Sequence, residues 1–247
     1  MKKSILLCIF IMLLCCNSAA VFAEPIRVAI NPDSKPFKYY DENGSFAGID
    51  ADVMKALAEE LDLEIEYVEM KFEDIFESVE SCEVDAAISA LSKTENRSEQ
   101  VFFTDAYLMG QLSAFVRMKN DNYKDISDEN INIIGSKTGT TAETAGREIA
   151  GMFNLEQKHY ENYAELFAAL ENDQIDAALS DEILAKEFVN SYADIMTIGQ
   201  VIAIEPYAIA VCPNNDELLQ KFNNGLASLQ QSGKLEEILL TNLMGNN

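Results

Sequence analysis

The sequence predicts an α/β fold made of two Rossmann-like lobes of similar build. The order strand, helix, strand over residues 26–69 is typical of a parallel α/β sheet. In addition, residues 72–89 align without a gap with residues 163–180, and we call this similarity the internal echo. Chance likeness between two helix–strand units is the alternative, but two lobes of similar build explain the echo better.

The first elements follow from hydrophobic patterning. The run IRVAI at residues 26–30 is short and β-rich, and it predicts a buried strand. The stretch at residues 48–61 begins with aspartates and then repeats apolar residues at helical spacing, which predicts an amphipathic helix. In LEIEYVE at residues 63–69, apolar residues alternate with glutamates, as in a strand with one solvated face.

Two crossings between the lobes are predicted. A polar stretch leads into a new strand at residues 131–135, so we place the first crossing near Ser113–Met118. The late β-run at residues 205–211 returns the chain near Ala203–Ala208, and its Glu205-Pro206-Tyr207 is expected to set hinge geometry and not to contact ligand. Two amphipathic helices follow. The predicted boundaries are lobe 1 over 24–114, lobe 2 over 115–205, and a return to lobe 1 over 206–247.

Residues 1–23 are predicted to be an export signal and are set aside from the fold. Lysines precede an apolar run that is too short to span a bilayer comfortably, and Val21-Phe22-Ala23 fits the small-x-small cleavage rule. We therefore expect an exported protein, periplasmic or associated with the cell surface. A lipid anchor at Cys15 or Cys16 is not favoured, because neither cysteine follows a small residue.

The chain is strongly acidic, with 42 acidic against 18 basic residues and a formal net charge of −24. This charge argues against nucleic acid and anionic lipid as partners, because both require a basic footprint. Beyond the signal, Cys82 and Cys212 remain; they either form a disulfide, which export permits, or stay separate thiols. The sequence holds no metal-ligand cluster or nucleophile–histidine pairing, so we expect no metal and no cofactor.

Charged residues follow the last strand of each copy of the echo. The first copy is followed by ALSKTENR, which contains Arg97, and the second by Asp181. Ligands of open parallel sheets bind outside the carboxyl ends of strands. One cleft holding both would complement an amino-acid zwitterion, since arginine grips a carboxylate with two parallel bonds. The alternatives are a surface ion pair for Arg97 and a helix N-cap role for Asp181.

The chain resembles the family 3 solute-binding proteins, the periplasmic amino-acid receptors of ABC importers. The resemblance covers the whole chain after the signal and is most specific over residues 84–107. It implies the periplasmic binding protein type II architecture, with two lobes joined by a two-strand hinge. It also implies a free amino acid as ligand and the membrane permease of an ABC importer as partner, and we expect a monomer.

The resemblance assigns roles around the ligand backbone. It implies that Arg97 holds the α-carboxylate, helped by Ser92 and by the backbone amide of Thr141. It implies that Asp181 binds the α-ammonium, together with Ser92 and a carbonyl near Ser89.

Four positions indicate which kind of ligand side chain the site accepts. Phe72 looks like the apolar wall that covers it, although an ordinary core position fits the sequence equally well. Relatives that hold basic ligands look to have an acid where Asn31 stands and often an aromatic where Ser34 stands. Lys137 matches a lysine of some glutamine receptors and favours an oxygen-bearing side chain, unless it is simply solvated. We therefore expect a polar L-amino acid, glutamine- or glutamate-like rather than basic.

Two other function classes share this sequence pattern. Relatives that dehydrate cyclohexadienyl acids, prephenate or arogenate, look nearly the same and need an acid catalyst. Glu143 and Glu182 are the candidates, but both have a simpler interpretation as acids in the first turn of a helix. A ligand sensor for a signalling partner is the third class. We expect a binding protein and not an enzyme.

Overall fold

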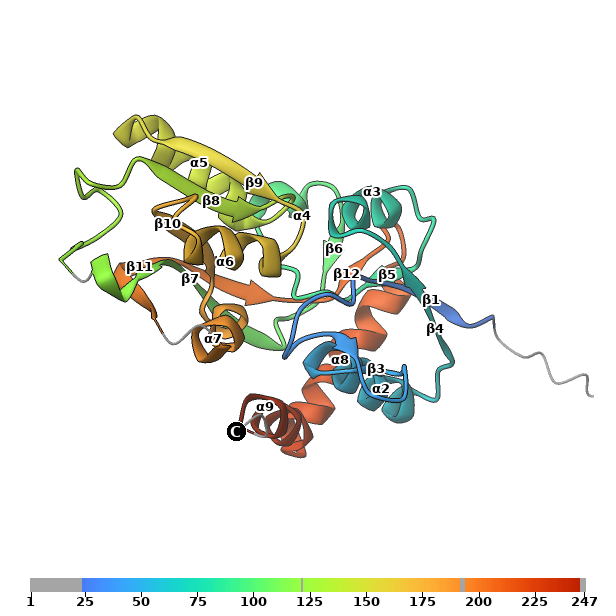
Figure 1. The fold of residues 1–247 in the computed structure, drawn as a ribbon. Coiled ribbons are helices and arrows are strands. Elements are labelled where there is room, and N and C mark those ends of the chain that lie inside the picture. The colour runs from blue at the N-terminus through green and yellow to red at the C-terminus, as the bar shows by residue number, and fades with distance from the viewer. Residues whose placement is uncertain (1–23, 121, 192–193, 245–247) are drawn as a thin grey trace, which may run out of the picture.

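The computed structural model describes residues 24–120, 122–191 and 194–244. Two α/β bodies lie side by side, each built on a five-stranded sheet (Figure 1). The predicted export signal at residues 1–23 lies outside the described residues. Within the described ranges, none of the helices combines the length and the apolar character needed to cross a membrane.

The first lobe contains the sheet β4-β1-β5-β12-β6. Its strands are β1 (Ile26–Ile30), β4 (Ile65–Glu69), β5 (Ala86–Ala87), β6 (Phe102–Phe103) and β12 (Ala210–Val211). Strand β1 is parallel to β4 and β5, whereas β12 is antiparallel to β5 and β6. A small hairpin, β2 (Tyr39–Tyr40) and β3 (Phe46–Ala47), precedes the first helix.

Helices cover both faces of this sheet because successive strand residues point to opposite sides. Val28 and Ala86 pack toward α2 and α8, while Ala29 and Ala87 pack toward α3. The helices are α2 (Ile49–Leu61), α3 (Ile75–Glu80) after the short helix η1 (Phe72–Asp74), α4 (Glu95–Ser98), α8 (Asp216–Gln231) and α9 (Lys234–Met244). Gly225 lets α8 approach α2, since a Cβ there would lie 2.7 Å from the Cδ2 atom of Leu57.

The second lobe contains the sheet β11-β7-β10-β8-β9. Its strands are β7 (Leu108–Arg117), β8 (Ile133–Lys137), β9 (Glu156–Tyr160), β10 (Ala177–Asp181) and β11 (Ile195–Tyr207). Its helices are η2 (Met118–Asn120), α5 (Thr141–Phe153), α6 (Tyr163–Glu171) and α7 (Glu182–Ser191). Leu179 packs toward α5 and Ala178 toward α6, so these two helices cover opposite faces.

The internal echo is confirmed as a structural repeat. In the first sheet β1 lies between β4 and β5, and in the second β8 lies between β9 and β10, all in parallel. The first copy of the echo forms α3 and β5, and the second forms α6 and β10. Each copy therefore supplies the middle strand of its sheet, so Arg97 and Asp181 are associated with corresponding strands of the two lobes.

Two strands, β7 and β11, join the lobes; they pair from Leu108–Tyr207 to Leu112–Ala203 and, beyond an irregularity, from Ala114–Ile198 to Arg117–Ile195. The crossing expected near Ala203–Ala208 lies at this joint. The crossing expected at Ser113–Met118 does not, because residues 112–115 already pair with β10 inside the second sheet, which puts the joint of β7 at residues 108–111. The lobe boundaries drawn from the sequence stay a prediction.

A disulfide joins Cys82 and Cys212, with 5.2 Å between their Cα atoms. It connects the turn before β5 to the residue after β12, within the first lobe. The structure therefore selects the disulfide over the two separate thiols that the sequence also allowed. The bridge closes a loop that contains the whole second lobe.

Candidate functional site

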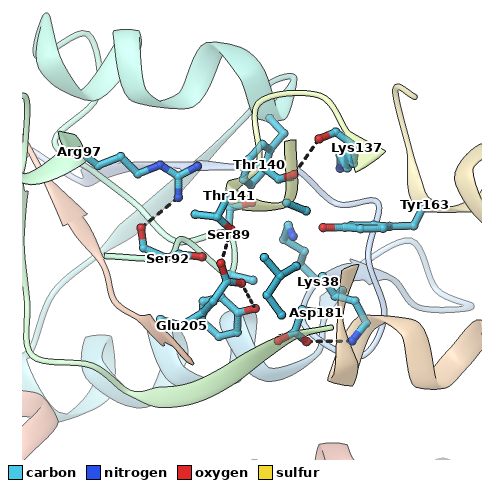
Figure 2. A pocket seen from close by; sticks show the side chains of 16 residues that line it. Lys38, Ser89, Ser92, Arg97, Lys137, Thr140, Thr141, Tyr163, Asp181 and Glu205 are labelled. Carbon is cyan, nitrogen blue, oxygen red and sulfur yellow. Dashed lines mark hydrogen bonds between the residues drawn. The ribbon is translucent and has the colours of Figure 1, made fainter. Parts of the chain in front are cut away.

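A small cavity lies between the two lobes, with side chains from both in its wall (Figure 2). Its volume is about 20 Å³, which is room for about one water molecule. The first lobe contributes Lys38, Phe72, Ser89, Ala90, Ser92 and Arg97; the second contributes Lys137, Thr140, Thr141, Ala142, Tyr163, Asp181 and Leu184; the joining strands contribute Leu112, Glu205 and Tyr207. All but one of the residues predicted to bind ligand are in this wall.

Arg97 reaches the cavity from α4, whose N-cap Thr94 accepts a bond from the Arg97 amide at 3.3 Å. Its Nη1 donates to the carbonyl of Ser92 at 3.0 Å, and its Nη2 donates to the carbonyl of Gly139 at 2.9 Å. Burial lowers the pKa of Arg97 to about 10, so the side chain is charged at neutral pH. Within the described residues no carboxylate forms an ion pair with Arg97. The surface ion pair considered from the sequence is therefore wrong.

Asp181 ends β10 and is only 4 % exposed. Its Oδ1 accepts bonds from the amides of Ile183 at 2.7 Å and Leu184 at 3.1 Å, so the carboxylate caps α7. Its Oδ2 accepts a bond from the amide of Gln111 at 3.0 Å. Burial raises the pKa of Asp181. Its carboxylate is thus both a helix cap and part of the cavity wall.

Hydroxyl groups and a helix N-terminus complete the wall near Arg97. Helix α5 begins at Thr141, and the Thr140 hydroxyl caps it by accepting a bond from the Glu143 amide at 3.3 Å. Amides at a helix N-terminus attract negative charge. The Ser89 hydroxyl accepts a bond from the Asn31 amide at 3.2 Å. This part of the wall is suited to an anionic group.

Lys137 lies at the end of β8 and is 2 % exposed, so its alternative interpretation as a solvated lysine is wrong. Its Nζ lies 2.5 Å from Oδ2 of Asp33 and 3.3 Å from Oδ1 of Asn31. The same atom lies 5.2 Å from the centre of the Phe72 ring and 5.0 Å from that of Tyr163. Burial lowers the pKa of Lys137. Asn31 is the predicted site residue that does not line the cavity; it supports Lys137 from outside.

Comparison with known families assigns the fold. Residues 26–243 match the model of the bacterial extracellular solute-binding proteins, family 3. The chain belongs to this family. The match spans both lobes and the return to the first, which confirms the family and the fold that the sequence motifs predicted.

Relatives of this family 3 protein include proteins named for binding amino acids. The arginine-binding extracellular protein ArtP of Bacillus subtilis is 27% identical to it, over 96% of each chain. The structure of an ancestral arginine-binding protein bound to arginine matches with a TM-score of 0.81 and 31% identity, covering 87% of this chain and 96% of the other. The structure of an ancestral arginine-binding protein bound to glutamine matches with a TM-score of 0.81 and 30% identity, covering 89% and 98%.

The lining residues of this family 3 protein that were not predicted from the sequence include Lys38, Tyr163, Glu205 and Tyr207. The echo contained a signal for Tyr163, because it aligns with Phe72 and both rings are in the wall. No local pattern marks Lys38, which a loop brings into the cavity. Tyr207 follows Glu205 on β11 and was assigned with it to the hinge.

Glu205 shows why the prediction for the joining strand was incomplete. It pairs with Gly110 at the joint, as a hinge residue would, but its side chain is 5 % exposed and lines the cavity. Its carboxylate accepts bonds from the hydroxyls of Thr141 and Tyr207, and burial raises its pKa.

The two acids considered as catalysts do not line the cavity. Glu143 accepts a bond from the Gly139 amide at 2.7 Å, and Glu182 accepts one from the Ser113 hydroxyl at 2.6 Å. Both are in the first turn of a helix, as the simpler interpretation predicted.

Proposed function

We propose that this protein binds a polar amino acid outside the cytoplasm and delivers it to the permease of an ABC importer. One observation carries the proposal: Arg97, which lies on the helix after β5, and Asp181, which ends the corresponding strand β10, line one cavity. A free amino acid has one carboxylate and one ammonium group, and each finds an opposite charge there. The names of the relatives, extracellular and arginine-binding, support export and amino-acid binding.

The charged groups of the cavity wall are already positioned to bind an amino-acid zwitterion. Among the described residues, the Arg97 guanidinium donates hydrogen bonds only to the neutral carbonyls of Ser92 and Gly139, so a ligand carboxylate would offer stronger charge-assisted bonds. The amides at the start of α5, at Thr141 and Ala142, support the same anion. Asp181 is fixed by three backbone amides and accepts the ammonium without reorganising.

At the other end of the cavity, the wall favours an oxygen-bearing side chain. Lys137 presents a buried ammonium group, which is a donor without acceptors, beside the rings of Phe72 and Tyr163. A guanidinium or a second ammonium would meet a like charge there. Relatives named for arginine argue for a basic ligand, and the fold is also known with glutamine bound. We assign a glutamine- or glutamate-like ligand because of the charge of this wall.

Binding requires the lobes to move apart. The cavity has about 20 Å³, whereas ligand pockets for small molecules have about 300 Å³ or more. The joint between β7 and β11, at residues 108–111 and 203–207, is the place where a few residues can absorb a rotation. We propose that the two lobes open and close there, and that one zwitterion bridging them favours the closed form.

A thermal-shift screen of the common amino acids on the purified protein tests this function. A ligand at about a hundred times its dissociation constant should add about 2.7 kcal/mol to the free energy of unfolding. A screen in which no amino acid shifts the melting temperature refutes amino-acid binding. If arginine gives the largest shift, amino-acid binding stands and our side-chain assignment is wrong. Turnover of prephenate or arogenate by the same sample would assign the dehydratase activity instead.

A further inference from the structure

A second lysine, Lys38, lines the same cavity and has no role in the function proposed above. We propose that Lys38 selects a ligand whose side chain ends in a carboxylate, so that the cavity takes an acidic amino acid in preference to its amide. This inference rests on the proposed function of the same cavity and narrows its substrate class.

The backbone of Lys38 is held rigidly. Its amide donates to the carbonyl of Ser34 at 2.8 Å, and its carbonyl accepts a bond from the Ser34 amide at 2.9 Å. The same loop is fixed to the start of α2, where the amides of Ile49 and Asp50 donate to the carbonyls of Pro36 and Phe37 at 3.0 and 2.8 Å. The side chain therefore enters the cavity from a fixed base (Figure 2).

The side chain of Lys38 is almost entirely buried, but its ammonium nitrogen is not fully enclosed. The residue is 2 % exposed, yet its Nζ forms neither a hydrogen bond nor an ion pair with any residue that the structure describes. The nearby carboxylate of Asp50 is already engaged, because its Oδ1 accepts from the Tyr107 hydroxyl at 2.6 Å and its Oδ2 from the Ala90 amide at 2.8 Å. A buried charge is costly unless it is paired. The ammonium group of Lys38 therefore lacks a negatively charged partner, which a ligand could supply.

Lys137 differs in this respect, because Asp33 already lies 2.5 Å from its Nζ. Both ammonium groups face the ring that we expect to cover the ligand side chain: Lys38 Nζ lies 5.9 Å and Lys137 Nζ lies 5.2 Å from the centre of Phe72. A side chain against this ring comes within reach of two cations, of which only Lys137 is paired. The carboxylate of a ligand side chain would balance the positive charge of the unpaired ammonium group of Lys38.

The chemistry of the ligand end then ranks three kinds of amino acid. A carboxylate provides acceptors and the missing negative charge. A carboxamide provides an oxygen but no charge, and its NH₂ group finds no acceptor on a lysine. A guanidinium or ammonium group brings like charge to two buried cations. The expected order of affinity is glutamate, then glutamine, then arginine.

A structural role offers a different account of Lys38. Asp50 attracts the Lys38 ammonium over a longer distance, and Lys38 in turn favours the charged form of Asp50. If this attraction were the whole purpose of Lys38, its removal would destabilise the first lobe but leave ligand discrimination unchanged. The test must therefore measure a ratio of affinities and not stability alone.

Calorimetric titration of L-glutamate, L-glutamine and L-arginine into the wild type, Lys38→Met and Lys55→Met tests the inference. Lys55 is exposed on α2 and serves as the matched loss of one lysine charge outside the cavity. We expect the wild type to prefer glutamate over glutamine at least about 10-fold. Lys38→Met should weaken glutamate binding by about 30-fold or more, the loss typical of breaking one buried charge pair, and should reduce the preference. Lys55→Met should change neither.

The possible outcomes distinguish a failure of the proposed function from a failure of the proposed role of Lys38. If no amino acid binds the wild type, the proposed function fails. If amino acids bind but glutamine matches or exceeds glutamate, or arginine binds best, the function survives and the role of Lys38 is refuted. The same holds if Lys38→Met keeps the wild-type ratio. Should Lys38→Met fail to fold, the ratio in the wild type and in Lys38→Arg, which retains the charge, still decides the question.

Discussion

The Nη2 atom of Arg97 donates to the carbonyl of Gly139 at 2.9 Å, and this bond joins α4 of the first lobe to the segment before α5 of the second. The Nη1 atom of Arg97 donates to a partner within its own lobe, the carbonyl of Ser92. Arg97 is therefore both a cation in the cavity wall and a direct link between the lobes. Its removal should affect ligand binding and closure together.

Arg97→Ala should abolish amino-acid binding while the fold persists. A ligand carboxylate left without its charged partner should lose about 2–5 kcal/mol of binding free energy. Calorimetry measures the loss, and circular dichroism checks the fold. Arg147→Ala is the control, because Arg147 is an exposed arginine whose ion pair with Glu143 lies outside the cavity wall. Binding within a few-fold of the wild type in Arg97→Ala would show that the carboxylate is held elsewhere.

Asp181→Asn should weaken binding and cost less stability than Asp181→Ala, although its NH₂ group cannot accept the bond that the Gln111 amide donates to Oδ2. Asparagine caps helices about as well as aspartate, so α7 keeps its cap while the charge that attracts the ligand ammonium is lost. Asp181→Ala should weaken binding similarly and also lower the melting temperature, since it removes the cap. Comparing the two variants by calorimetry and thermal melting separates the roles. Wild-type affinity in Asp181→Asn would leave only the capping role.

The preference for glutamate over glutamine should decline as the pH rises above about 8. Burial lowers the pKa of Lys38 from 10.5 to about 8, against the attraction of Asp50 and Asp33 and together with the repulsion of Lys137. Below this pKa the ammonium is charged and attracts the ligand carboxylate; above it, binding must also supply a proton, so the affinity falls. Glutamine is the matched ligand, because its α-ammonium titrates in the same way.

Titrations at several pH values between 6 and 10 measure this preference in the wild type and in Lys38→Met. The variant should show a flatter profile, with the remaining slope due to Lys137, whose pKa burial also lowers. A ratio of the two affinities that stays constant over this range in the wild type would contradict the role of Lys38.

Ligand should make the protein more compact in solution. In the proposed function one zwitterion contacts Arg97 from one lobe and Asp181 from the other, so it should stabilise the closed form by its differential affinity for the two forms. The radius of gyration from solution X-ray scattering should decrease on addition of ligand, and Asp181→Ala should weaken this change. An identical profile with and without saturating ligand would argue that the lobes do not open at the joint.

Local sequence patterns determined the elements and the two charged ends of the site. Apolar periodicity depends on which face of each helix or strand is buried, so residues 48–61 and 63–69 could be assigned without tertiary information. The internal echo then placed two strands at corresponding positions. Because ligands bind at the carboxyl ends of parallel strands, the residues that follow, Arg97 and Asp181, could be chosen as a pair.

Only the tertiary structure decided which other side chains meet them. Lys38 enters from a loop and Glu205 from a joining strand, and neither position has a periodicity that marks it as part of a cavity. The joint at residues 108–111 depends on the register of β7 against β10 and β11, and the disulfide depends on β5 and β12 being neighbours. Periodicity records burial along one segment, whereas strand order and register decide which distant segments come into contact.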